Sequence, residues 1–191
     1  MKELVLALAL LAPLERLDAS LQQVVQAHRA GWLERPMRAA TDVGKPVVVT
    51  SALLAIAVFD LAEGVPLARV ALVAAVVVNL VVEGVKRATN RTRPDGDANR
   101  ANSSFPSSHA ANAFALAVIF ARRWPRGAPW FFAAALVVSA ARVYLNRHFT
   151  SDVLAGAIIG AGLTLVVARR MRWRVGVSPR ATAPAGAAPG G

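Results

Sequence analysis

The sequence predicts an all-α fold, a polytopic membrane helix bundle of five to six helices. The 191-residue chain is 55% hydrophobic and only 17% charged, with a mean hydropathy of +0.46. An ordinary soluble domain is roughly 45–50% apolar and about 25% charged. The apolar residues also come in long blocks rather than at amphipathic spacing. Both observations favour membrane-spanning helices, and the chain length fits one bundle.

Five apolar blocks are candidates to cross a hydrocarbon core of about 30 Å, which takes roughly 20 helical residues. They are Val47–Ala62, Val65–Val85, His109–Ala121, Ala128–Leu145 and Val153–Ala168. The second is the strongest candidate. Its run of β-branched residues does not argue against a helix, because in lipid the backbone must satisfy its own hydrogen bonds. The third is the shortest and contains Asn112, which indicates a helix buried against its neighbours.

The N-terminal residues 1–46 have a different pattern, typical of interfacial, amphipathic helices. Leu4–Ala12 is apolar but too short to span, and it lacks a convincing cleavage site for a signal peptide. Leu14–Ala40 mixes apolar and charged residues at helical spacing, with breaks predicted at Gly31 and Pro36. Residues 47–170 are expected to form the transmembrane bundle. Residues 171–191, basic and then rich in Ala, Pro and Gly, are expected to be a disordered tail.

Charge and composition exclude several functions. A net charge of +11 is typical of nucleic-acid-binding proteins, but here the basic residues lie in short gaps between apolar blocks rather than along one polar face. We therefore expect no nucleic-acid partner. The chain has no Cys, which excludes a disulfide framework, a thiolate zinc site and a cysteine nucleophile.

Alternating spans sort the loops into two groups. The group with the denser arginine contains residues 122–127 and the start of the tail, and the positive-inside rule places it in the cytoplasm. The other group contains the polar loop 86–108 and the turn 146–152. We predict a multi-pass cell-membrane protein with this second group on the extracytoplasmic face.

Nearly all reactive side chains lie in three segments of that second group. The first has Lys86 followed by Arg93-Pro94, the second is Pro106-Ser107-Ser108-His109, and the third runs from Arg142 through His148 to Asp152. Lys and Arg beside helix N-terminal N–H groups form a phosphate cradle. We therefore predict that phosphate is bound by Lys86, Arg93, Ser107, Ser108 and Arg142.

The histidines and the aspartate of these segments suit group transfer. A carboxylate four residues after a histidine can hold one ring nitrogen and leave the other free to attack, which makes His148 the predicted nucleophile and Asp152 its orienting group. His109 comes from another helix and can protonate the leaving oxygen as a general acid. The third histidine, His28, lies in the surface segment and is expected to be solvated.

These segments resemble the three signature motifs of the type 2 phosphatidic acid phosphatase (PAP2) family, which is related to the vanadium haloperoxidases. The family pattern is Lys-x6-Arg-Pro, Pro-Ser-Gly-His and Ser-Arg-x5-His-x3-Asp. This chain departs from it only by Ser108 in place of Gly and Ala141 in place of Ser. The side chain of Ser108 adds bulk where glycine allows close approach, but neither change removes a group that the chemistry requires.

The resemblance implies a lipid phosphatase with a phosphohistidine intermediate on His148, with no metal and no other cofactor. Its expected substrate is a lipid phosphate or diphosphate, undecaprenyl diphosphate first, with phosphatidate and phosphatidylglycerophosphate as alternatives. A vanadate-dependent peroxidase and a noncatalytic anionic-lipid binder or small transporter are the competing hypotheses. The membrane spans argue against the peroxidase, and the lack of repeated halves argues against a transporter.

Other polar residues have structural explanations. Asn79 and Asn112 are predicted to hydrogen-bond between helices. Asp95-Gly96-Asp97 is predicted to form a turn. A metal site is the less favoured interpretation of these three residues. Glu83 lies one turn before Lys86, so an ion pair between them is predicted, although it could serve packing alone. The remaining basic residues of the loop 86–108 and of the third segment are expected to contact solvent or headgroups: Arg87, Arg91, Arg100 and Arg147.

Overall fold

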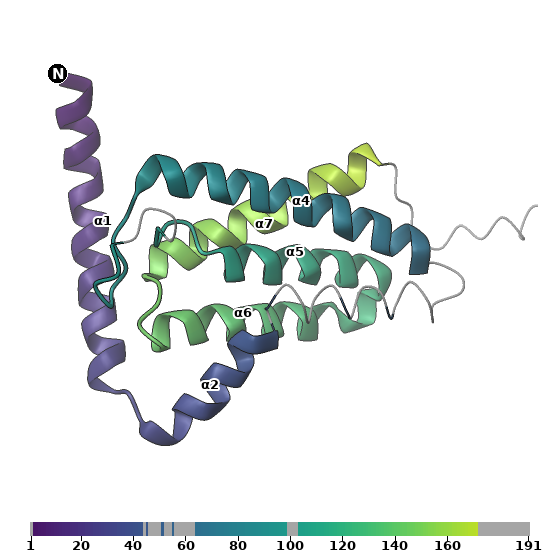
Figure 1. Ribbon diagram of the computed structural model, residues 1–191, viewed down its shortest axis with the longest axis horizontal. Helices are drawn as coiled ribbons and strands as arrows, with labels where there is room; N and C mark the ends of the chain where they lie inside the picture. The colour runs from purple at the N-terminus through teal and green to yellow at the C-terminus, as the bar shows by residue number, and fades with distance from the viewer. Residues whose placement is uncertain are drawn as a thin grey trace, which may run out of the picture.

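The computed structural model describes residues 2–43, 45, 51, 55, 64–98 and 103–171. These residues form six α-helices and one short 3-10 turn, with no strand among them, which confirms the all-helical prediction (Figure 1). The elements are α1 (Lys2–Ala27), α2 (Gly31–Val43), α4 (Gly64–Thr89), α5 (Ser108–Arg123), η2 (Pro125–Gly127), α6 (Ala128–Tyr144) and α7 (Thr150–Arg170).

Within the described residues, three helices are long and apolar enough to cross a membrane. They cover Val65–Thr89, Pro125–Tyr144 and Thr150–Arg170, and so match the second, fourth and fifth predicted segments. The third predicted segment is α5, which has 16 residues and packs on α4, α6 and α7. The first, Val47–Ala62, lies almost entirely outside the described residues, as does the tail beyond Met171.

The core of the bundle lies around α5. One face of α4 is fully buried at positions three and four apart, namely Leu67, Val70, Ala71, Ala74, Val78 and Val82, which is the stripe that a helix presents to its neighbours. Asn79 and Asn112 join α4 to α5 by exchanging two side-chain hydrogen bonds, of 2.9 and 3.1 Å. The predicted role of both asparagines is thereby confirmed.

Helices α5 and α7 make the closest approach in the bundle, and two glycines of α7 allow it. A Cβ atom on Gly160 would lie 2.0 Å from the Ala111 carbonyl oxygen, and one on Gly156 would lie 2.4 Å from that of Ser107. No side chain fits in either gap. The close approach brings the first turn of α7 against the first turn of α5, where the backbone N–H of Ser107 bonds the carbonyl of Asp152 at 3.0 Å.

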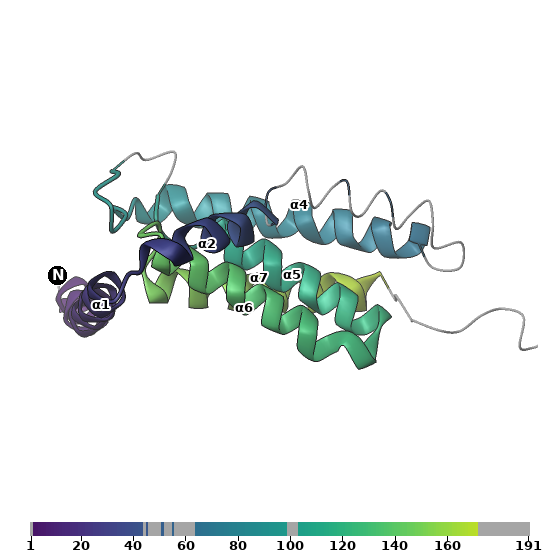
Figure 2. The ribbon, with the colours of Figure 1, turned by 90° about the horizontal axis from the view of Figure 1, so that it is seen from below.

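The N-terminal helices lie against one end and one side of the bundle. Helix α1 lies across the bundle end (Figure 1), and α2 runs back along α6 (Figure 2). The Tyr144 hydroxyl, at the end of α6, accepts from the N–H of Ala30 at 2.8 Å and donates to its carbonyl at 2.6 Å. Gln22 and Gln26 donate to carbonyls of the last turn of α6, which have no partner within that helix.

The predicted break at Pro36 is wrong, because α2 continues through this residue. A proline inside a helix removes one backbone hydrogen bond, here to the carbonyl of Trp32. Both Pro36 and Trp32 are exposed, so that carbonyl can be solvated. The break at Gly31 coincides with the start of α2. The interfacial position of residues 1–46 stays a prediction.

Candidate active site

The three sequence motifs meet at one end of the bundle. The end of α4 carries Lys86, the start of α5 carries His109, and the end of α6 carries Arg142. His148 lies in the short turn between α6 and α7, and Asp152 lies in the first turn of α7. Because α4 and α6 end where α5 and α7 begin, all of these residues lie at the end of the bundle next to α1 (Figure 1).

His148 is almost completely buried, with 1% of its surface exposed. Its Nδ1 atom lies 2.8 Å from the carbonyl oxygen of Ser104, in the loop before α5. A carbonyl oxygen can only accept, so Nδ1 must be the donor and carry the hydrogen. The Nε2 atom of a neutral His148 ring then has a free lone pair, which is the state that a nucleophile needs.

The charge state of His148 fits this assignment. Burial lowers the pKa of its imidazole to about 4; the nearby charges of Arg142 and Arg93 also lower it, and Asp152 opposes the shift. At neutral pH the ring is therefore uncharged. A neutral ring with a defined tautomer is ready to attack without first losing a proton.

Asp152 holds the loop around His148 rather than the ring directly. Its Oδ2 atom accepts from the Ser104 hydroxyl at 2.5 Å and from the N–H of Phe149 at 2.8 Å. The distance from Oδ2 to His148 Nδ1 is 3.7 Å, which is too long for a hydrogen bond. In this structure the group that fixes the ring is thus the Ser104 carbonyl, and Asp152 acts on the ring through Ser104.

Three buried or half-buried cations lie near His109, and two of them, Arg93 and Arg142, also act on His148. Lys86 and Arg93 are each only 7% exposed, and the charges of Lys86, Arg93 and Arg142 all act on His109. The Nε atom of Arg142 is buried with no hydrogen-bond partner in the described part of the chain. Burying like charges together is unfavourable unless an anion joins them. The cluster is therefore suited to bind a multiply charged anion such as phosphate.

The pKa and the hydrogen bonds of the Arg93 guanidinium depend on the loop in which it lies. Burial lowers the pKa of the Arg93 guanidinium, although the charges of Asp95 and Asp97 oppose the shift. Its Nη1 atom donates to the carbonyl of Arg147 at 3.3 Å. Gly96, with a φ of +88°, makes the turn that was predicted between the two aspartates, and the Gly96 N–H donates to the Arg93 carbonyl.

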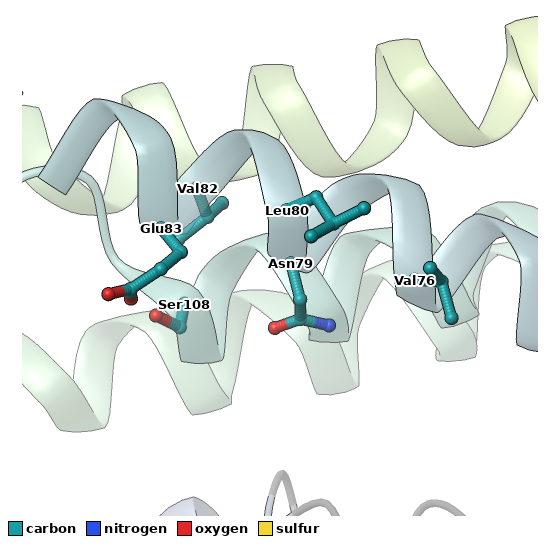
Figure 3. Close-up of a pocket in the computed structure, with 6 residues that line it drawn as sticks. All are labelled: Val76, Asn79, Leu80, Val82, Glu83 and Ser108. Carbon is teal, nitrogen blue, oxygen red and sulfur yellow. The ribbon is translucent and has the colours of Figure 1, made fainter. Parts of the chain in front are cut away.

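Ser107 and Ser108 lie at the start of α5, but their hydroxyls have different surroundings. Ser107 is fully buried as the N-cap, and its Oγ accepts from the N–H of Ala110 at 3.4 Å. The side chain of Ser108 instead lines a groove of about 430 Å³ between α4 and α5, near Glu83 and Asn79 (Figure 3). The other backbone N–H groups of this first turn, those of Ser108 and His109, have no carbonyl partner within the helix and point out of the helix end.

Two sequence-based expectations about charged residues are wrong. Glu83 forms its ion pair with Arg87, at 3.0 Å and one turn along the same helix face, and acts on Lys86 only through its charge. Arg91 is not a solvated or headgroup residue. It is half-buried and forms ion pairs with Asp18 at 2.8 Å and with Asp152 at 2.6 Å. Two carboxylates thus take the place of water as hydrogen-bond acceptors for the Arg91 guanidinium.

Ser104 and Asp18 are the residues that sequence reasoning missed. Ser104 lies two residues before the second motif, and nothing in the sequence distinguishes it from the neighbouring Ser103. Asp18 lies about 130 residues before its partner Ser151, in a segment with an ordinary amphipathic pattern. A buried aspartate on the polar side of an amphipathic helix gives no signal until the docking surface of the helix is known.

Within the described residues, no group of three or more His, Asp or Glu side chains is arranged to hold a metal ion. The site presents basic groups, two imidazoles and helix N–H donors. Groups of these kinds can bind and polarise a phosphoryl oxygen, and a neutral imidazole can accept a phosphoryl group.

Comparisons with known proteins agree with the motifs. The model of the PAP2 superfamily matches residues 67–175. A lipid A 1-phosphatase of Porphyromonas gingivalis is 42% identical over 84 residues, which cover 42% of this chain and 18% of that protein. A lipid A 1-phosphatase of Rhizobium johnstonii is 34% identical over 101 residues, covering 47% of this chain and 41% of that protein. The matches thus span less than half the length of these curated relatives.

Solved structures show the same fold. The crystal structure of Aquifex aeolicus LpxE superposes with a TM-score of 0.72 at 22% identity, covering 80% of this chain and 95% of that one. A PAP2-type phosphatidylglycerolphosphate phosphatase from Bacillus subtilis gives a TM-score of 0.72 at 24% identity, covering 88% and 92%. With the family model matching more than half of its residues, the chain belongs to the PAP2 superfamily.

Proposed function

We propose that this protein is an integral membrane phosphohydrolase that removes phosphate from a lipid phosphate or diphosphate through a phosphohistidine intermediate. The observation that carries the proposal is the state of His148. Its ring is buried and neutral, its Nδ1 hydrogen is held by the Ser104 carbonyl, and its Nε2 is free. The charges of Arg142 and Arg93 act on the same ring, so an anion beside it would be held by both.

The proposed reaction has two steps. In the first, Nε2 of His148 forms a bond to phosphorus as the bond from phosphorus to the leaving oxygen breaks. His109 takes up a proton when the anionic substrate offsets the cations around it, and gives that proton to the leaving oxygen. In the second, His109 takes a proton from water, whose oxygen displaces His148 and releases inorganic phosphate. Lys86, Arg93 and Arg142 neutralise the charge on the phosphoryl oxygens throughout.

The N-terminal turn of α5 is proposed to complete the phosphate cradle. The N–H groups of Ser108 and His109 lie at this positive helix end, whereas those of Ser107 and Ala110 already bond the Asp152 carbonyl and the Ser107 hydroxyl. Because the Ser107 carbonyl and Ala111 pack against the glycines of α7, this turn is fixed relative to His148. Ser108 contributes its N–H in this scheme, since its hydroxyl lines the groove on the α4 side.

The names of the relatives direct the choice of substrate. The two relatives described above carry the name lipid A 1-phosphatase, and a third, from Bacteroides thetaiotaomicron, is a lipid A 4'-phosphatase that is 43% identical over 60 residues. We therefore place a phosphorylated glycolipid of the lipid A type first. Undecaprenyl diphosphate, predicted from the family resemblance alone, becomes the second substrate to test.

We also propose that the site faces the extracytoplasmic side. The end of the bundle opposite to the site carries Arg122 and Arg123 at the end of α5, Arg126 in η2, and Arg169 and Arg170 at the end of α7. This distribution fits the positive-inside rule. A single cysteine at the exposed Ala98 would be labelled by an impermeant thiol reagent in intact cells, and labelling only after lysis would contradict the orientation.

The test of the proposed function is phosphate release by the detergent-purified protein in the presence of EDTA. The substrates are lipid A bearing a 1-phosphate, undecaprenyl diphosphate and phosphatidate. His148→Ala is expected to abolish release, whereas His28→Ala is expected to leave it unchanged, because His28 is exposed and its Nδ1 contacts only a carbonyl of its own helix. Binding of all three lipids without turnover would refute the proposal and favour a noncatalytic lipid binder. Activation rather than inhibition by vanadate would favour the peroxidase.

A further inference from the structure

Helix α1 contributes a buried carboxylate to the catalytic end of the bundle. Asp18 is 2% exposed, although it lies on a helix whose neighbouring side chains are largely exposed. Its Oδ1 atom accepts from the N–H of Ser151 at 2.9 Å, and its Oδ2 atom accepts from the Ser151 hydroxyl. Asp18 thus satisfies a backbone donor in the first turn of α7, which has no side-chain cap from its own N-cap residue, Phe149.

Arg91 connects Asp18 to the third motif. Its Nη2 atom donates to Asp18 at 2.8 Å, and its Nη1 atom donates to Asp152 at 2.6 Å and to the Ser151 hydroxyl at 2.8 Å. The guanidinium also lies over the Phe149 ring, 4.4 Å from its centroid. Burial acts to lower the pKa of Arg91, but its bonds to Asp18 and Asp152 and their charges raise it. Arg91 therefore stays charged between two carboxylates.

The same contacts continue to the imidazole. Asp152 uses Oδ1 for Arg91 and Oδ2 for the Ser104 hydroxyl. The Ser104 carbonyl then accepts the Nδ1 hydrogen of His148. Each contact from Asp18 to His148 is a direct hydrogen bond between residues that are at least half-buried. Away from water such bonds are strong and depend closely on geometry.

We propose that Asp18 and Arg91 are positioning residues for His148, and that α1 thereby forms part of the catalytic structure. Asp18 holds Arg91, Arg91 fixes the carboxylate of Asp152, and Asp152 fixes Ser104, whose carbonyl sets the tautomer and direction of the ring. The expected change in kcat rests on the proposed function. The expected change in the tautomer and direction of the His148 ring does not.

A purely structural role for Asp18 makes a different prediction. Helix α1 and its connection to α2 are also held to the bundle by the Tyr144 hydroxyl, which bonds both backbone groups of Ala30. Within the described residues, Tyr144 has no hydrogen bond or ring contact with Arg91 or Asp152. Tyr144→Phe therefore loosens the N-terminal segment without touching the chain of bonds, and it serves as the matched control.

The kinetic test compares Asp18→Asn, Arg91→Gln, the double variant and Tyr144→Phe with the full-length protein in detergent. Asp18→Asn keeps the shape of the side chain and one acceptor but removes its charge. We expect kcat to fall on the order of tenfold with KM changed less than about twofold, as for a misplaced reacting group. Since Asp18 acts through Arg91, the double variant should have the kcat of Arg91→Gln alone.

The spectroscopic test needs no substrate. The protein is labelled with 15N-histidine, and the His148 signals are assigned with His148→Ala. We expect a single neutral tautomer with the hydrogen on Nδ1 in the wild type and in Tyr144→Phe, and exchange between tautomers in Asp18→Asn. Equal spectra for Asp18→Asn and the wild type, or equal losses of kcat in Asp18→Asn and Tyr144→Phe, would overturn the inference. Wild-type protein with no turnover would contradict only the proposed function, because the tautomer measurement still decides the positioning role.

Discussion

Gly160→Ala is expected to separate α7 from α5 and to destabilise the whole catalytic end. The added Cβ would lie 2.0 Å from the Ala111 carbonyl oxygen, whereas ordinary contacts begin near 3.4 Å. Two rigid backbones meet at this point, so no side chain can rotate away. Helix α7 must therefore move by more than about 1 Å, which is larger than a packed core absorbs without strain.

The expected loss of stability follows from two effects. Overpacking of a well-packed core costs about 1–3 kcal/mol. The displacement also stretches the bond between the Ser107 N–H and the Asp152 carbonyl, now 3.0 Å, and a buried hydrogen bond contributes about 1 kcal/mol. A total of about 3 kcal/mol corresponds to a decrease in Tm of about 6–12 °C for a domain of this size.

The assay is thermal unfolding of the detergent-purified protein, with Gly162→Ala as the matched control. Gly162 lies half a turn further along the same helix, and nothing lies within 4 Å of its added Cβ. Replacing a glycine inside a helix with alanine at such a site gains about 0.5–1 kcal/mol. Equal Tm values for the two variants, or a lower Tm for Gly162→Ala, would refute the close α5–α7 packing described above.

Three further measurements test the site. Because the pKa of His148 is lowered to about 4, its 15N signals in the resting protein should stay those of a neutral ring as the pH falls from 8 to 5, and a midpoint near 6.5 would contradict its burial. Arg142→Gln should weaken inhibition by orthovanadate at least about tenfold, since it removes a charged donor whose Nε lacks a partner in the described structure; unchanged inhibition would exclude Arg142 from the phosphate site. Asn79→Leu and Asn112→Leu should each lower stability by about 1 kcal/mol, and the double variant should lose less than the sum, because each single change already removes both hydrogen bonds between the two helices; additive losses would contradict the pairing.

The sequence predicted the all-helical fold and three of the spans because these depend on local properties. A run of apolar residues long enough to cross a bilayer determines a helix almost regardless of its neighbours. The buried α5 was also predictable, since Asn112 indicated a protein partner and not lipid. Pro36 shows the limit of local rules: a proline predicts a break, but tertiary packing of α2 on α6 and solvent at the free carbonyl keep the helix continuous.

The site was partly predictable from the motif spacing. Lys86, Arg142, His109 and His148 come together because α4 and α6 end where α5 and α7 begin, which follows from alternating the spans. The contact that fixes the His148 ring was not predictable. The i to i+4 spacing suggested Asp152, but Nδ1 lies 2.8 Å from the Ser104 carbonyl and 3.7 Å from Asp152. Backbone carbonyls carry no sequence signal, so only the path of the loop could reveal this acceptor.

The most direct test of the central claim is to trap the phosphoenzyme. The purified protein is mixed briefly with a lipid phosphate labelled with 32P in the transferred group, then denatured, and the label bound to protein is tested for stability. We expect a bond that is labile in acid and stable in alkali, and that is absent in His148→Ala. Label that survives acid, or label that persists in His148→Ala, would contradict a phosphohistidine on His148.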